Sequence, residues 1–121
     1  MEDGFGVEIG IEPEKLKAYR NNEINMSIAI TSGDIKSSYW CECDVEVKPP
    51  LSLASDRELS TGRTRMGIIG PNGRIAKPIH VYTRPNNFPA EYELGVTAYI
   101  YDSEGTIAKR IDKKSTVICE E

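Results

Sequence analysis

The feature that most constrains this chain is the alternation of apolar and polar residues over short segments, the period of a strand with one buried face. The segment AEYELGVTAYIYD is the clearest case. Strands are also predicted at GFGVEIGIE, EINMSIAIT and SYWCECDVEV, each bounded by turn-forming residues or proline. The predicted core faces are Phe5, Val7, Ile9 and Ile11; Ile24, Met26, Ile28 and Ile30; Tyr39, Cys41, Cys43, Val45 and Val47; and Tyr92, Leu94, Val96, Ala98 and Ile100.

The remaining segments are less regular. A short strand is expected at residues 65–69, and AKPIHVYTRP is extended, with Pro78 indicating an edge or bulged position. TIAKRIDKKSTVIC supplies a last strand that could break near Asp112, and PEKLKAY forms either a short helical turn or an extension of the edge strand. With about seven or eight strands and almost no helix, the pattern predicts an all-β fold, an immunoglobulin-like two-sheet antiparallel sandwich.

The length of 121 residues suits one domain, expected to span residues 1–121. The net charge of −4 lacks the basic excess typical of nucleic-acid binders, and a local group at Lys109, Arg110, Lys113 and Lys114 is best explained as the guard of an exposed strand edge. No segment is long and apolar enough to span a bilayer. A cytoplasmic location is expected if Met1 is the native start, and a secreted or cell-surface location if the chain is an excised domain.

The order of segments from Val45 to Gly105 resembles small immunoglobulin-like domains of prokaryotic surface and multidomain proteins, the CARDB and fibronectin type III-like group. The match is carried by VEVKPPLSL, by RMGIIGPNGRIAKPIHVYTRP, and by a strand that fits P-x-x-Y-x-L-x-V-x-A-x-x-x-D-x-x-G. The residues matching that strand are Pro89, Tyr92, Leu94, Val96, Ala98, Asp102 and Gly105. The resemblance implies a binding or spacer module with no catalytic residues.

Tyr92 stands near the start of this strand. In such a position a tyrosine can bury its ring while its hydroxyl bonds to backbone across the corner between strands. We therefore predict a structural role for Tyr92.

The three cysteines are predicted to be buried thiols. Cys41 and Cys43 lie two apart on a strand, roughly 7 Å along the chain, whereas a disulfide needs Cβ atoms about 4 Å apart. A disulfide from Cys119 to Cys41 or Cys43 stays open if the last strand lies beside the strand at residues 39–47. A metal site of the three cysteines with His80 has little support from spacing, so no cofactor is expected.

Trp40, Tyr99 and Tyr101 fall on outward positions of two strands that neighbour each other in many such sandwiches. They could form an exposed aromatic patch, or Trp40 could be a core tryptophan shifted by a bulge. We predict a non-enzymatic module that binds a protein partner or itself through Trp40, Tyr99 and Tyr101, rimmed by Glu42, Glu93 and Thr97. The alternatives are strand addition at the edge near residues 79–83, a carbohydrate-binding module on the same aromatic face, and a small thiol or metal protein.

Overall fold

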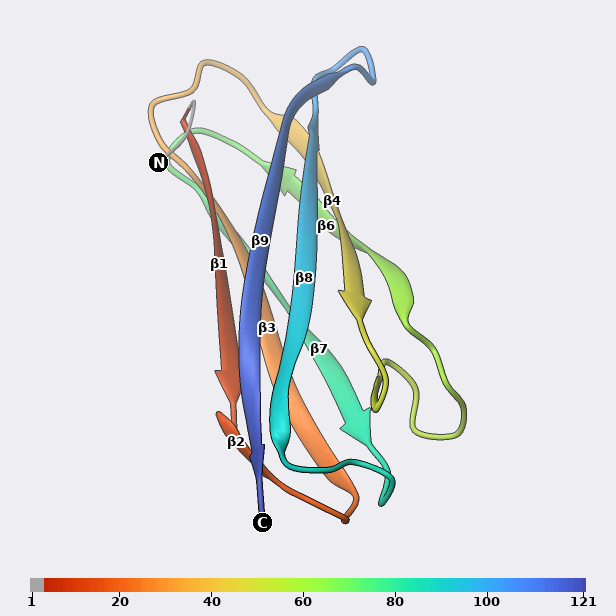
Figure 1. The fold of residues 1–121 in the computed structure, drawn as a ribbon. Helices are drawn as coiled ribbons and strands as arrows, with labels where there is room; N and C mark the ends of the chain where they lie inside the picture. Colours follow the sequence, from red (N-terminus) through yellow and green to blue (C-terminus); the bar gives the residue numbers. More distant parts are fainter. Residues whose placement is uncertain (1–3) are drawn as a thin grey trace.

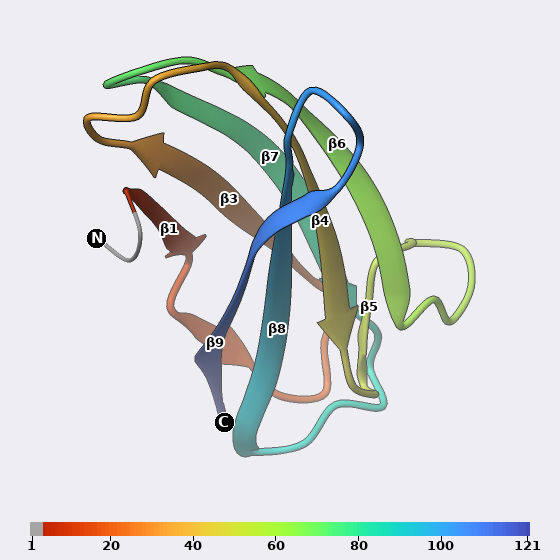
Figure 2. The same ribbon diagram turned by 90° about the horizontal axis from the view of Figure 1, so that it is seen from above.

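The structure is a computed structural model that describes residues 4–121, in which nine strands and no helix occur. The strands form two sheets that face each other (Figures 1 and 2). The predicted all-β sandwich is confirmed. The strands are β1 (Phe5–Glu12), β2 (Lys15–Lys17), β3 (Asn22–Ser32), β4 (Tyr39–Val47), β5 (Leu51–Ser52), β6 (Thr61–Ile69), β7 (Arg74–Thr83), β8 (Ala90–Tyr101) and β9 (Ile107–Glu120).

The four-stranded sheet has the order β1-β3-β7-β5, and the five-stranded sheet has the order β2-β9-β8-β4-β6. All pairings are antiparallel except that of β2 with β9. The central strand of the five-stranded sheet is β8, with β4 on one side and β9 on the other. The outward side chains of these three strands therefore lie next to one another on one face.

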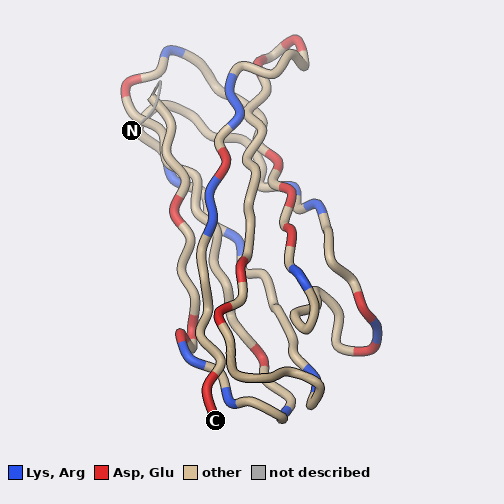
Figure 3. The backbone as a smooth tube through the Cα atoms, viewed as in Figure 1, with Lys and Arg blue, Asp and Glu red and all other residues tan. Residues whose placement is uncertain are grey.

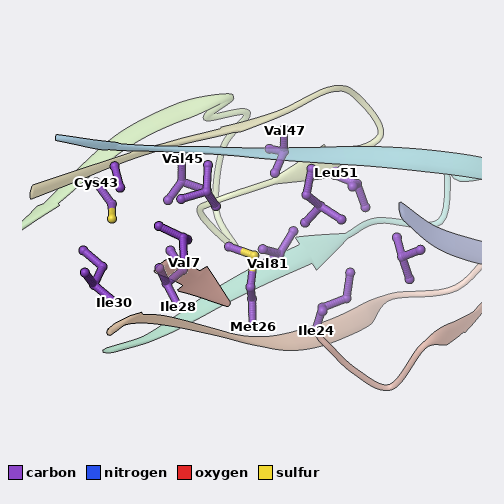
Figure 4. Packing of buried hydrophobic residues seen from close by; sticks show 14 of the residues in the cluster. Val7, Ile24, Met26, Ile28, Ile30, Cys43, Val45, Val47, Leu51 and Val81 are labelled. Atoms are coloured by element: carbon purple, nitrogen blue, oxygen red, sulfur yellow. The ribbon is translucent and has the colours of Figure 1, made fainter. Parts of the chain in front are cut away.

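The core lies between the sheets and follows the predicted alternation. All the predicted inward residues of β3, β4 and β8 are buried except Tyr39, which is half-buried and packs edge-on against Phe5. Figure 4 shows part of this cluster, with Cys43, Val45 and Val47 directed toward side chains of the opposite sheet. Burial of this apolar surface is the main force that holds the sheets together.

The chain changes sheets after Pro13. Residues Lys15–Lys17 form β2, which pairs in parallel with Ile118–Glu120 of β9. The expected helical turn is therefore wrong, and the segment is extended, as the alternative predicted. It does not continue the strand of β1, however, but lies in the other sheet. Leu16 and Ala18 are both buried, and this period-two burial favours strand over helix.

Two other boundaries differ from expectation. The strand at β6 begins at Thr61 rather than near Arg65, and β9 continues unbroken through Asp112. Asp112 fits within the strand because it faces outward and accepts a hydrogen bond from Thr97 at 2.7 Å.

Pro78 lies on a strand that is an edge for most of its length. β5 pairs only with Tyr82 and Thr83, so the rest of β7 has no strand on that side within residues 4–121. The edge prediction for β7 is confirmed. Two residues of the proposed strand-addition site at 79–83 are already paired, and this leaves little room for a partner there.

Tyr92 has the predicted structural arrangement. Its buried hydroxyl donates to the carbonyl oxygen of Phe88 and accepts from the backbone N–H of Phe88 at 3.1 Å. Its ring also packs edge-on against the Phe88 ring, with centroids 6.1 Å apart. The tyrosine closes the turn that leads into β8.

Candidate interaction surface

Three predicted aromatic residues lie on the outer face of the five-stranded sheet. The register pairs Trp40 with Tyr101 and Glu42 with Tyr99, so the side chains of β4 and β8 are direct neighbours. Trp40 is 37% exposed, and the rings of Tyr99 and Tyr101 stack at a centroid separation of 6.5 Å. The structure thus places Trp40 on the patch and not in the core.

Two isoleucines extend the patch, and the sequence analysis missed both. Ile68 of β6 is paired with Trp40, and Ile107 of β9 is paired with Tyr101. They are 65% and 53% exposed. The side chains of Ile68, Trp40, Tyr101 and Ile107 thus form a line across four neighbouring strands, which we call the apolar row.

Two register shifts explain why these isoleucines face outward. In β6 the shift lies at Met66, which has no partner residue in β4, and the next residue, Gly67, has a φ of +116°. As a result Met66 and Ile69 are both buried, and Ile68 between Gly67 and Ile69 is exposed. In β9 the shift falls opposite the step from Ile100 to Tyr101. Simple alternation would have turned Ile68 to the side of Met66.

Polar groups border the row along the strands. Arg63 donates to both carboxylate oxygens of Asp44, at 2.7 and 3.1 Å, and contacts Glu42 at 3.4 Å. The hydrogen bond from Arg63 lowers the pKa of Asp44. The Trp40 indole Nε1 donates to Glu42 at 3.2 Å. This set of contacts fixes the orientation of the indole beside a charged border.

Tyr99 joins the row to a more polar region. The guanidinium carbons of Arg63 and Arg110 lie 5.6 and 5.8 Å from its ring centre, within cation–π range. Further along β8, Thr97 bonds to Asp112, and Asp112 also contacts Arg110 at 3.5 Å. The basic and acidic groups here largely neutralise one another.

A shallow hollow of about 690 Å³ lies on this face beyond Tyr99. Its floor includes Gly95, where the missing side chain leaves space between the outward residues of β4 and β9. Thr97 lines the hollow, as do Asp44 and Asp112. Of the predicted rim residues, Glu42 and Thr97 lie beside the aromatic rings, whereas Glu93 lies further along β8 and pairs with Lys114 at 3.8 Å.

The cysteines are free and buried, as predicted. Cys119 pairs with Ala90 of β8, whereas Cys43 pairs with Ala98 and Cys41 with Ile100 of the same strand. Ala90 and Ala98 are eight residues apart, which is about 27 Å along the strand. β9 pairs with β8 and β2 and does not lie beside β4, so a disulfide to either of these cysteines is excluded. Burial raises the pKa of Cys41 to about 11 and that of Cys43 to about 12, and this suppresses thiolate chemistry.

His80 is exposed on the outer face of the other sheet. Its Nδ1 lies 3.1 Å from Glu23, and its ring stacks with Tyr82. Because Cys41, Cys43 and Cys119 point into the core, they do not converge with His80. Among residues 4–121 no group of three or more histidine, cysteine or acidic side chains is arranged to hold a metal ion.

No protein-family model matches the chain, and no curated protein matches it significantly. Solved structures do resemble its fold. Escherichia coli α2-macroglobulin matches with a TM-score of 0.61 and 14% identity over 97% of this chain, which corresponds to 7% of that protein. AvmM, which catalyses macrocyclization in alchivemycin A biosynthesis, matches with a TM-score of 0.60 and 8% identity, covering 99% of this chain and 90% of that one.

A CARDB domain from Pyrococcus furiosus, solved with two bound metal ions, matches with a TM-score of 0.51 and 14% identity, covering 96% of this chain and 87% of that one. The expected likeness to CARDB domains therefore holds at the level of distant structural similarity. The part of the chain that the structure describes contains no helix long and apolar enough to cross a membrane. Together these findings show an all-β sandwich with immunoglobulin-like and CARDB-like neighbours.

Proposed function

We propose that this chain is a non-enzymatic interaction module that binds another protein through the apolar row and its charged border. The observation that carries the proposal is the alignment of Ile68, Trp40, Tyr101 and Ile107 on one exposed sheet face. Large apolar side chains gathered on a surface commonly mark contact sites. Tryptophan and tyrosine are also the residues that most often dominate binding energy.

The dimensions of the row fit the centre of an interface. Four strands spaced about 4.8 Å apart give a row about 14 Å across. A stable interface buries about 800 Å² on each partner, which is more than the row alone provides. The border formed by Glu42, Arg63 and Tyr99 would therefore also contact the partner. The expected partner surface is apolar at its centre and carries polar groups at its rim.

The residues elsewhere support a non-enzymatic role. The cysteine thiols are buried and their raised pKa values disfavour nucleophilic attack. His80 lies on the four-stranded sheet, away from the row, and contacts Glu23 of the same sheet. Near the row, Arg63 pairs with Glu42 and Asp44, and Arg110 pairs with Asp112.

Photo-crosslinking in native cells tests the proposal. A photoreactive phenylalanine analogue at Trp40 should give specific adducts, whereas the same analogue at Tyr82, on the other sheet, should not. With the captured partner purified, Trp40→Ala should weaken binding about thirtyfold, the effect of a hot-spot loss near 2 kcal/mol. Tyr82→Ala is the matched control. Equal effects of the two substitutions, or adducts from Tyr82 alone, would refute the proposal.

A second candidate is carbohydrate binding, and the hollow beside Tyr99 favours it. Asp44, Thr97 and Asp112 supply hydrogen-bonding groups, and the charges of the two aspartates are balanced by neighbouring arginines. A neutral polyhydroxylated ligand suits such a surface better than an ion does, because it offers donors and acceptors without net charge.

Glycan-array screening followed by titration of Trp40 fluorescence tests this candidate. Binding that is lost in Tyr99→Ala and Asp112→Asn, but kept in Tyr82→Ala, would support a sugar site. No glycan binding by the wild-type protein would remove the candidate and leave protein binding untouched.

A further inference from the structure

Two unpaired strand edges lie together on one side of the sandwich. β1 pairs only with β3, so its other edge carries no strand within residues 4–121. β9 pairs along its length with β8, but on its other side β2 covers only Ile118–Glu120. On that side, no strand of the described residues pairs with residues 107–117.

The sandwich is hollowed between these two edges. A space of about 580 Å³ is lined by Phe5 and Val7 of β1 and by Ile111 of β9. Glu8 and Lys113 stand at its lips. Lys113 is exposed although alternation with the buried Ile111 would turn it inward, so its side chain leaves the core at this edge, while Phe5, Val7 and Ile111 remain buried. An added strand would find strand edges without a partner strand beside this space.

The two edges carry opposite charges. β1 contains Glu8 and Glu12, both exposed, and no basic residue. Residues 107–117 of β9 contain four basic residues and one acidic residue; Arg110 contacts Asp112 and Lys114 contacts Glu93, whereas Lys113 forms no ion pair within residues 4–121. Figure 3 shows the basic positions along the upper half of β9 and the acidic positions along β1. Glu8, Glu12 and Lys113 form no ion pair with another residue of the described range, so each is available to a partner.

We propose that a second copy of this chain docks on this side, with β1 of each copy added to the free edge of β9 in the other. In Figure 1, β1 and β9 run in the same direction. A two-fold axis parallel to the strands would therefore place β1 of one copy parallel to β9 of its partner. β2 already pairs with β9 in this parallel sense, just beyond the free segment. The result is a closed dimer with two continuous sheets.

Charge selects this arrangement over its alternative. A two-fold axis perpendicular to the sheets would pair β1 with β1 and β9 with β9, bringing like charges together on both edges. Like charges directly opposite each other in a sheet are destabilising. The lysines that would repel a second β9 edge are the same residues that attract the acidic β1 edge, so they act as specificity determinants as well as guards.

Sedimentation velocity over a concentration series, at low and high salt, tests the proposal. The wild-type protein should show a reversible monomer–dimer equilibrium that weakens as salt screens the charges. Glu8→Lys with Glu12→Lys should raise the dimer dissociation constant about tenfold or more, and Lys113→Glu with Lys114→Glu should do the same. All four substitutions in one chain restore opposite charges across the proposed interface and should restore the dimer.

The control is Glu58→Lys with Glu104→Lys, which changes the net charge by as much as Glu8→Lys with Glu12→Lys does, but at exposed loop positions, and should leave the dimer intact. Circular dichroism of each variant confirms that the fold is retained. A wild-type monomer at all concentrations, or a four-residue variant that stays as weak as its parents, would overturn the proposal. Trp40→Ala should not affect this dimer, and a dimer lost in Trp40→Ala would instead assign self-association to the apolar row.

Discussion

The contact of Tyr92 with the turn before β8 gives the sharpest prediction for stability. Tyr92→Phe keeps the ring and its packing against Phe88 but removes the hydroxyl. That hydroxyl makes two hydrogen bonds with the Phe88 backbone, one as donor and one as acceptor. At a net 0.5–1.5 kcal/mol for each bond, the free energy of unfolding should fall by about 1–3 kcal/mol.

The expected change in melting temperature follows from chain length. An unfolding entropy of about 2.1 cal/mol/K per residue makes each 1 kcal/mol worth roughly 4 °C in a chain of this size, so Tm should fall by about 4–12 °C. Urea denaturation should show a lower midpoint with an unchanged slope. Tyr82→Phe is the control, because the Tyr82 hydroxyl makes no hydrogen bond within residues 4–121 and should matter by less than about 0.5 kcal/mol. Equal stability of the two variants would refute the reasoning.

Three further predictions follow from the surface and the core. Asp44→Asn should be less stable than the wild type at neutral pH, because Arg63 lowers the pKa of the Asp44 carboxyl in the folded protein. The difference in stability should vanish as the pH falls through that lowered pKa. A difference that persists in acid would contradict the pairing of Asp44 with Arg63. The three buried cysteines should resist a thiol reagent at neutral pH in the native protein and react after unfolding, so rapid native labelling would contradict their burial. Gly67→Ala should cost about 1 kcal/mol in denaturation experiments because its φ of +116° disfavours a side chain; no loss would argue against the bulge.

The alternation of apolar residues predicted the faces of β3, β4 and β8 well. In these strands the rule holds because one face meets the opposite sheet. In β3, for example, Ile24, Met26 and Ile28 are buried and the residues between them are exposed. The same rule placed Trp40, Tyr99 and Tyr101 outward. Their adjacency required the additional assumption that β4 and β8 are neighbours, which the structure bears out.

Sequence alternation could not predict the rest of the surface, because bulges interrupt the period. Ile68 and Ile107 turn outward only after a register shift in their own or the neighbouring strand. The position of residues 15–17 depends on pairing with the distant end of β9, which no local pattern reveals. The location of Cys119 likewise depends on strand order, so the possible disulfides could be decided only from topology.

Fluorescence of Trp40 in dilute protein tests the central claim most directly, because the chain contains one tryptophan and the proposed binding face depends on its being uncovered. The account predicts long-wavelength emission that acrylamide quenches readily, consistent with an indole that is 37% exposed. Addition of the purified partner that photo-crosslinking identifies should shift the Trp40 emission to shorter wavelength and reduce its quenching by acrylamide. Short-wavelength emission protected from acrylamide in the free monomer would place Trp40 in the core and contradict the proposed interaction surface.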